Sequence, residues 1–181
     1  GVKANNENLD AFYANRLGYT VEGPKTETVN LTRPFAQLNV ATLDYDWAAN
    51  SGIEITETAI EVEGVYTSFN LLNEYGAVTG IPTTLRLSKN DIPSDVLNVN
   101  NKDYKWISMN YLLVNEKTTV RAKMTTNNEN VTREWYNIPV QRNYRTNIVG
   151  NILTTTTDFN VVIDERFAGD INYTSPVTTQ E

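Results

Sequence analysis

Asp44 and Asp46 are the residues whose spacing comes nearest to a catalytic arrangement. A glycosidase needs only two carboxyl groups, one as the acid and one as the base or nucleophile. Residues two apart on a strand share a face, so these two carboxylates could converge. The alternative is a solvated turn, which is the common state of acidic loop residues, and we favour it. Two further acidic pairs are interpreted in the same way: Glu54 with Glu57, and Asp164 with Glu165.

Two residue types that carry most enzyme chemistry are missing, because the 181 residues include no histidine and no cysteine. The sequence therefore lacks the imidazole base of hydrolase triads, cysteine nucleophiles, thiolate metal ligands and disulfides. No serine has a lysine three residues further on, and the glycines are too scattered for a phosphate-binding loop. Calcium could use the oxygen-rich stretch 98–103, but that stretch contains a lysine. We predict a protein that is not an enzyme and that has no cofactor and no metal site.

Trp47 is the aromatic residue best placed to contact a ligand, because it follows Asp46 in a predicted loop or single helical turn. An indole ring can stack on the C–H groups of a sugar, while neighbouring acidic groups bind hydroxyls. Trp106 and Trp135 lie inside predicted strands, where we expect them to fill the core. The candidate ligand-binding residues are therefore Asp44, Tyr45, Asp46 and Trp47.

Alternation of apolar and polar residues predicts the elements that would position these groups. Leu38 and Val40 show the two-residue period of a half-buried strand, and the apolar run 104–114 is typical of a central strand buried on both faces. Residues 79–103 contain Gly, Pro, Asn and Asp and are predicted to be a long irregular connection with a short helical turn near 94–97. Seven or more short strands without an amphipathic helix predict an all-β protein, an antiparallel Greek-key β-sandwich.

The domain organisation follows from the same pattern. We predict an irregular lead-in over residues 1–27, a sandwich over 28–165 and a tail over 166–181. With 15 basic and 22 acidic residues, the formal charge is −7, which argues against nucleic acid and anionic membranes as partners.

Three segments with distinct patterns follow one another along the chain. The first, residues 33–40, has a basic residue before an alternating strand. The second, residues 65–71, ends in Phe-Asn-Leu, and the third, residues 137–147, has an Ile-Pro-Val strand followed by Arg-Asn-Tyr. In their order and spacing, the three segments resemble fimbrillin-like surface proteins of Bacteroidetes-type bacteria.

The resemblance implies a transthyretin-like sandwich that is exported as a lipoprotein and displayed at the outer membrane on the cell surface. It implies a fimbrial (pilus) stalk, tip or anchor subunit or a related adhesin, assembled by β-strand addition. The partners would be other fimbrial subunits, a second copy of the chain, or a host or bacterial surface protein or glycan. Attachment to the membrane would depend on an N-terminal lipid anchor, and this sequence does not contain the cysteine that would carry it.

The alternating residues Phe159, Val161 and Ile163 are the candidate strand for addition to another subunit. The alternative is an ordinary internal strand, because alternation indicates only half-burial. A glycan-binding module that uses exposed aromatic residues is the second functional hypothesis.

Overall fold

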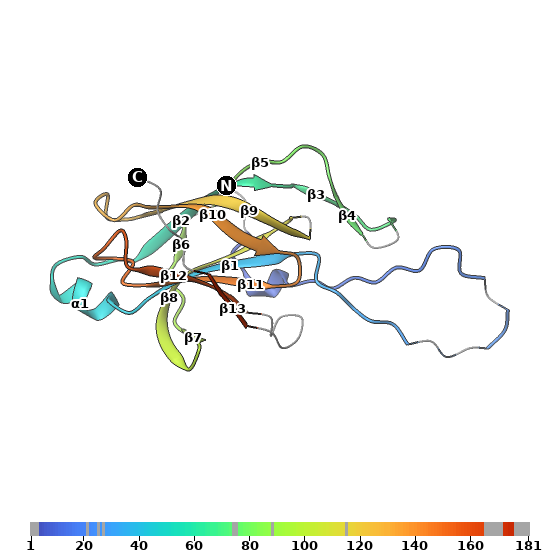
Figure 1. Cartoon of the computed structure of the whole chain (residues 1–181), viewed down its shortest axis with the longest axis horizontal. Helices are drawn as coiled ribbons and strands as arrows, with labels where there is room; N and C mark the ends of the chain where they lie inside the picture. The colour runs from blue at the N-terminus through green and yellow to red at the C-terminus, as the bar shows by residue number, and fades with distance from the viewer. Residues whose placement is uncertain are drawn as a thin grey trace.

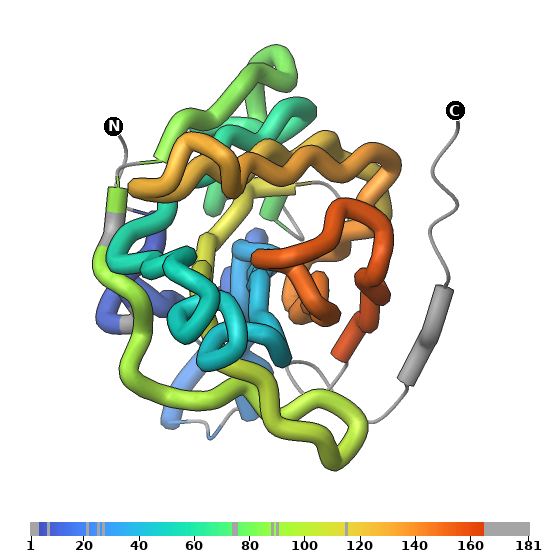
Figure 2. Tube along the Cα trace, turned by 90° about the vertical axis from the view of Figure 1, so that its left-hand side faces the viewer, coloured from blue at the N-terminus to red at the C-terminus, as the bar shows by residue number. Residues whose placement is uncertain are grey.

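The computed structural model describes residues 4–20, 22–24, 26, 28–73, 76–87, 89–114, 116–164 and 172–175. The described chain is a sandwich of two main β-sheets, which Figure 1 shows from the side and Figure 2 shows from one end. The six-stranded sheet has the order β13-β12-β11-β1-β8-β7. Its strands are β1 (Ala36–Thr42), β7 (Val96–Val99), β8 (Lys102–Leu112), β11 (Arg145–Gly150), β12 (Phe159–Asp164) and β13 (Asn172–Ser175).

The second main sheet has the order β10-β9-β2-β5, and β6 also pairs with β2. Its strands are β2 (Glu57–Val65), β5 (Thr83–Arg86), β6 (Asn90–Asp91), β9 (Lys117–Thr126) and β10 (Arg133–Gln141). A separate two-stranded sheet joins β3 (Ser68–Asn70) to β4 (Ala77–Thr79). Two short helices complete the described elements: the 3₁₀ helix η1 (Glu7–Leu9) and the α-helix α1 (Tyr45–Asn50).

The main core lies between the two sheets, as the alternation predicts. In β2, Ile60 and Val62 are buried, while Glu61 and Glu63 lie between and after them on the outer face. Leu38 and Val40 of β1 face them from the six-stranded sheet as members of the same apolar cluster. The prediction of an all-β sandwich with seven or more strands is confirmed.

One pair of neighbouring strands departs from the predicted antiparallel arrangement. β1 and β11 run parallel, with Gln37 opposite Arg145 and Thr42 opposite Gly150. Parallel neighbours need a long connection, and here β2 to β10 supply it. Local sequence patterns show that each strand exists but not which distant strand it joins.

The predicted irregular connection over 79–103 is wrong, because β5, β6 and β7 lie within it. These strands are two to four residues long, too short to show a period in the sequence. Asn100 and Asn101 have φ angles of 52° and 61° and form the turn from β7 to β8. This geometry is the one that Asn tolerates best among non-glycine residues. The helical turn predicted near 94–97 is also wrong, because β7 begins there at Val96.

The β7–β8 hairpin ends the six-stranded sheet and curls over the outer face of that sheet; Figure 2 shows it in yellow-green. Leu97 and Val99 pack there with Val149 and Val162, which lie on the outer face of that sheet. The pKa of Tyr104 on the same hairpin is raised, first by burial and second by the negative charge of Asp158. The main core covers one face of β1 and the cluster under the hairpin covers the other, so each of its seven residues is buried.

The described residues between η1 and β1 extend beyond the sandwich at the end opposite α1 (Figure 1). Tyr13 and Thr32 join the two sides of this extension, each donating its amide to the other's carbonyl at 2.9 Å. The predicted boundaries of lead-in, sandwich and tail stay a prediction. Ala4 of the lead-in packs on the main core, and β13 lies within the predicted tail.

Candidate functional site

Asp44 lies directly before α1, and its carboxylate accepts hydrogen bonds from within the fold. Only 7% of the residue is exposed. The carboxylate accepts hydrogen bonds from the amides of Leu153 (3.3 Å) and Thr154 (2.8 Å), and from the hydroxyls of Thr154 (2.6 Å) and Thr42. These bonds hold the turn after β11 against the end of β1. The structure therefore does not place Asp44 beside Asp46 at a shared exposed face.

Arg133 lies on the far side of the same turn and is also buried. Its guanidinium donates to the carbonyls of Thr132, Ile152, Leu153 and Thr155. Burial lowers the pKa of Arg133, and the negative charge of Asp44 opposes that shift. The two charged groups thus hold one turn from opposite sides, and we assign both to stability.

The other three predicted ligand-binding residues lie at this end of the sandwich with different exposures. Trp47 is 62% exposed on α1, and Asp46 beside it is also exposed. Tyr45 is partly buried and donates its hydroxyl to the carbonyl of Ile55 at 2.9 Å. The expectation that Trp47 is exposed is confirmed. No pocket described below includes these residues, so their role in binding stays a prediction.

The predicted strand-addition residues form β12, which is an internal strand. β12 pairs with β11 on one side and with β13 on the other. Val161 belongs to the main core, and Phe159 packs against it. Phe159 also meets the indole of Trp135 edge-on, with ring centres 6.3 Å apart. The run could join another subunit only by giving up one of its present neighbours.

Beyond the point where β7 ends, β8 has no paired strand on that side among the described elements, although its residues Ile107 to Leu112 are buried. β7 covers only Lys102 to Lys105 of β8. From Trp106 to Leu112, described groups reach this edge at separate points: the Thr58 hydroxyl donates to the Ile107 carbonyl at 2.8 Å, and the Tyr111 amide donates to the Ala4 carbonyl at 2.7 Å. Residues 4–9 thus lie along the edge and are joined to it at the Tyr111 amide, but they do not form a strand paired with β8.

Two cavities flank residues 4–9 along this edge. The first has a volume of ≈580 Å³ and a polar lining, and the second has a volume of ≈290 Å³ and a mainly apolar lining. The first is lined by Asn5, Asn6, Asn8, Thr58, Asp91, Ile92, Pro93, Asp95, Trp106, Ile107, Ser108 and Met109. The second is lined by Ala4, Leu9, Phe35, Tyr66, Thr67, Leu85, Tyr111 and Leu113. We call the edge and its two cavities the β8 groove.

The sequence did not reveal the β8 groove, because its residues come from five separate parts of the chain. Trp106 was expected in the core, and it does pack against two small apolar clusters while remaining partly exposed. Asp91 and Asp95 lay in a segment predicted to be irregular. Only the proximity of two carboxylates to an aromatic strand residue could have indicated the site.

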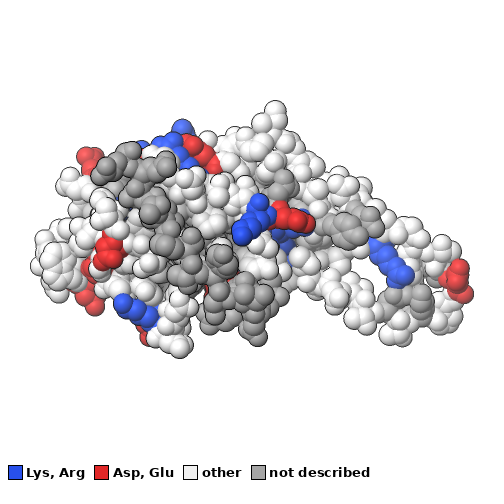
Figure 3. Space-filling model, in the orientation of Figure 1, with Lys and Arg blue, Asp and Glu red and all other residues white. Residues whose placement is uncertain are grey.

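The outer face of the five-stranded sheet carries paired charges instead of a binding site. Arg121 bonds the carboxylates of Glu63 (3.1 Å) and Glu134 (2.6 Å). Basic and acidic residues also lie side by side on the face shown in Figure 3. Within the described residues, no group of three or more acidic side chains is arranged to hold a metal ion. The helices among them are all too short or too polar to span a membrane.

The pKa of the Glu134 carboxyl is lowered, first by its hydrogen bond from the Tyr136 hydroxyl and second by its hydrogen bond from Arg121. An ordinary glutamate carboxyl has a pKa of about 4.3. We expect carboxyl NMR to show that Glu134 titrates below that value. A lowered folded-state pKa means that the stabilisation is present above the unfolded-state pKa and is lost as the pH falls through the folded-state pKa. Tyr136→Phe should move the Glu134 titration back toward the ordinary value, whereas an unchanged titration would contradict the assignment.

These features define an all-β sandwich with a sparsely paired sheet edge set in a groove between its two layers. The chain belongs to a family of unknown function (DUF6562), whose family model matches residues 2–180. No curated protein matches the sequence.

Two solved structures have a similar arrangement of the chain. One is a candidate cell adhesion protein from Bacteroides uniformis, with 11% identity and a TM-score of 0.47 over 75% of this chain and 51% of that chain. The other is a candidate cell adhesion protein from Bacteroides ovatus, with 10% identity and a TM-score of 0.47 over 86% of this chain and 49% of that chain. This chain therefore spans about half the length of each.

Proposed function

We propose that this chain is a non-enzymatic structural or adhesive domain of the cell surface that joins other subunits by β-strand addition in the β8 groove. The observation that carries the proposal is the sparsely paired edge of β8 between Trp106 and Leu112. The Tyr111 amide faces this edge, and strand alternation directs the Met109 amide the same way. An incoming strand could bond these groups and place a side chain in the apolar cavity.

The opposite edge of the sandwich is less suited to strand addition. β10 ends the five-stranded sheet, and its pairing with β9 shifts register between Trp135 and Ile138. Asn137 has a φ angle of 55°, and Pro139 has no amide hydrogen to donate. Bulges and prolines of this kind prevent edge-to-edge pairing. The pairing of β8 with β1 also shifts register, opposite Val40 and Ala41, but the part of β8 from Met109 to Leu112 has neither a register shift nor a proline.

The occupant we propose for the groove is a terminal strand of a second copy or of a related subunit. Residues 4–9 would leave the groove when that strand enters. The resemblance to fimbrillin-like proteins supports a place in a fimbria or an adhesin, with display at the outer membrane through a lipid anchor. These finer points rest on the resemblance alone.

Hydrogen exchange of the full chain tests this proposal. As the protein concentration is raised and the chain self-associates, we expect the amides of Met109 and Tyr111 to exchange at about one-tenth of their rate in the single chain or more slowly. An incoming strand would bond the Met109 amide and would replace the single bond of the Tyr111 amide to Ala4 with a bond inside a continuous ladder. Sedimentation on the same samples measures the association. A variant without residues 1–9 should associate at lower concentration, because the edge is already uncovered.

The β10 amides serve as the internal control and should be unchanged. If the assembled chain gains protection along β10 but not at Met109 and Tyr111, strand addition in the β8 groove is wrong. If neither the full chain nor the shortened variant associates and neither takes up a strand, the structural role is wrong as well.

A further inference from the structure

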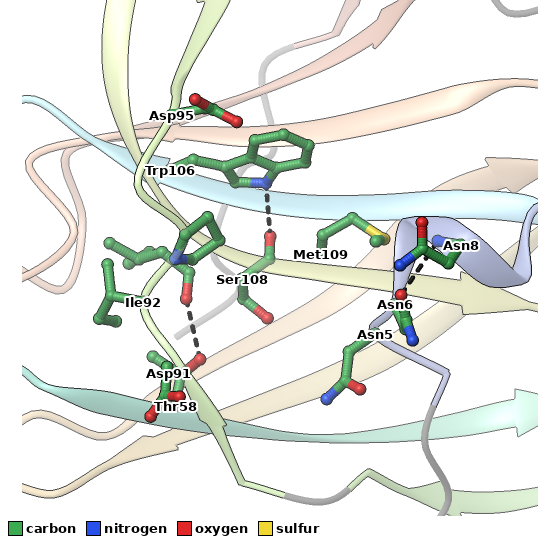
Figure 4. Close-up of a pocket in the computed structure, with 12 residues that line it drawn as sticks. Asn5, Asn6, Asn8, Thr58, Asp91, Ile92, Asp95, Trp106, Ser108 and Met109 are labelled. Carbon is green, nitrogen blue, oxygen red and sulfur yellow. Dashed lines mark hydrogen bonds between the residues drawn. The ribbon is translucent and has the colours of Figure 1, made fainter.

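The polar cavity of the β8 groove has the composition of a ligand site in its own right. Its volume of ≈580 Å³ lies within the range of small-molecule pockets, about 300–1,000 Å³. Figure 4 shows Trp106, Ser108 and Met109 along β8 on one side, with Asn5, Asn6 and Asn8 of the N-terminal segment beside Met109. Asp95 lies close to the indole ring in the same view.

Trp106 offers a rigid aromatic surface to this cavity. Its Nε1–H donates to the carbonyl of Ser108 at 2.9 Å, which fixes the orientation of the ring. The ring also packs against two apolar clusters, one with Leu97 and Val99 and the other with Met109 and Tyr111. A partly exposed ring that is already immobilised loses little conformational entropy when a ligand stacks on it.

The polar lining presents groups that suit hydroxyls. Asp91 and Asp95 supply carboxylate acceptors, and Asn6 and Asn8 supply side-chain amides that can donate. The Asn6 Oδ1 also accepts the backbone amide of Asn8 at 3.0 Å. Lys105 secures the loop before β7 by donating to the carbonyls of Pro93 and Ser94, and it does not line the cavity. The described lining thus contains two acidic residues and no basic residue.

We propose that this cavity binds an uncharged saccharide, with one pyranose ring stacked on Trp106 and its hydroxyls bonded by Asp91, Asp95 and the asparagine amides. Sugars present C–H groups on one face and hydroxyls around the rim, which matches an indole surrounded by carboxylates and amides. The described lining has two carboxylates and no basic side chain, so it repels carboxylated or sulfated sugars. The ligand class is therefore neutral.

This saccharide site differs from the one that the sequence predicted around Trp47. This site does not depend on strand addition, because its main groups are in place in the single chain. Trp106 lies on β8, Asp91 on β6 and Asp95 in the loop before β7. The two proposals can fail separately.

NMR of the full chain at low concentration tests the saccharide proposal, with the indole N–H signal of Trp106 as the direct readout. The probes are lactose, maltose, cellobiose and N,N′-diacetylchitobiose, with sialyllactose as the acidic match of lactose. We expect at least one neutral disaccharide to shift the Trp106 signal with a Kd of about 10 mM or tighter. Sialyllactose should bind about tenfold more weakly than lactose or not at all.

Two matched pairs of variants separate binding from folding. Trp106→Ala, with binding followed at the backbone amides of Ser108 and Met109, should lower the affinity about tenfold or more. Trp47→Ala, which removes an exposed indole outside the cavity, should leave the affinity unchanged. Asp95 is exposed, so Asp95→Asn should weaken binding without affecting the fold, and Asp46→Asn is its control. The proposal is overturned if no neutral probe binds at about 50 mM, if sialyllactose binds as well as lactose, or if the Trp47 or Asp46 variants weaken binding as much as their partners.

Discussion

Replacing Trp135 with alanine is expected to lower the free energy of unfolding by about 3–5 kcal/mol. Trp135 is 2% exposed and is among the largest fully buried side chains of the main core. It contacts Phe159 of the other sheet edge-on, so its ring joins the two layers between β10 and β12. Alanine would remove that contact and leave a cavity that the surrounding strands can fill only in part.

Urea denaturation measures this loss, and Trp47→Ala is the matched control. Trp47 has the same side chain but is 62% exposed, so its replacement should change the free energy of unfolding by no more than about 0.5 kcal/mol. Comparable losses for the two variants would mean that Trp135 does not hold the sheets together.

Replacing Asp44 with alanine is expected to cost about 3–5 kcal/mol, the range for removing one partner of a buried charged network. The change would leave the buried amide of Leu153 and the amide of Thr154 without their acceptor. It would also remove the negative charge that opposes the desolvation of Arg133. The turn after β11 would then lose its attachment to the end of β1.

Asp46→Ala provides the control, because Asp46 is two residues away and exposed on α1. We expect it to change stability by no more than about 0.5 kcal/mol in urea denaturation. If Asp44→Ala were as mild as Asp46→Ala and instead weakened ligand binding, the sequence-based assignment of Asp44 would be right and the stability assignment wrong.

The two acidic residues also show where sequence reasoning reaches its limit. Strand periodicity predicted β1, β8 and β12, because each is long enough to alternate or to be uniformly apolar. The same reasoning could not separate Asp44 from Asp46, since both precede or begin α1 with identical chemistry. Their difference in burial comes from residues 152–154, which are more than 100 positions away.

The candidate site was harder to predict than the fold. Sequence analysis predicted correctly that one tryptophan is exposed and that Trp135 is buried. Trp106 combines both conditions, because one part of its ring packs on apolar side chains and another lines a polar cavity. A residue of this kind is identified only when the N-terminal segment and the loop before β7 are placed beside it.

The parallel pairing of β1 with β11 has a consequence for how the protein folds. The paired residues Gln37 and Arg145 are 108 positions apart, so the centre of the larger sheet closes a very long loop. Such contacts form slowly, because the entropy of loop closure is lost before the contacts stabilise the chain. During synthesis, β1 would emerge long before β11 and would remain unpaired on that side. The apolar residues of β1 would need protection from aggregation until β11 (Arg145–Gly150) arrives.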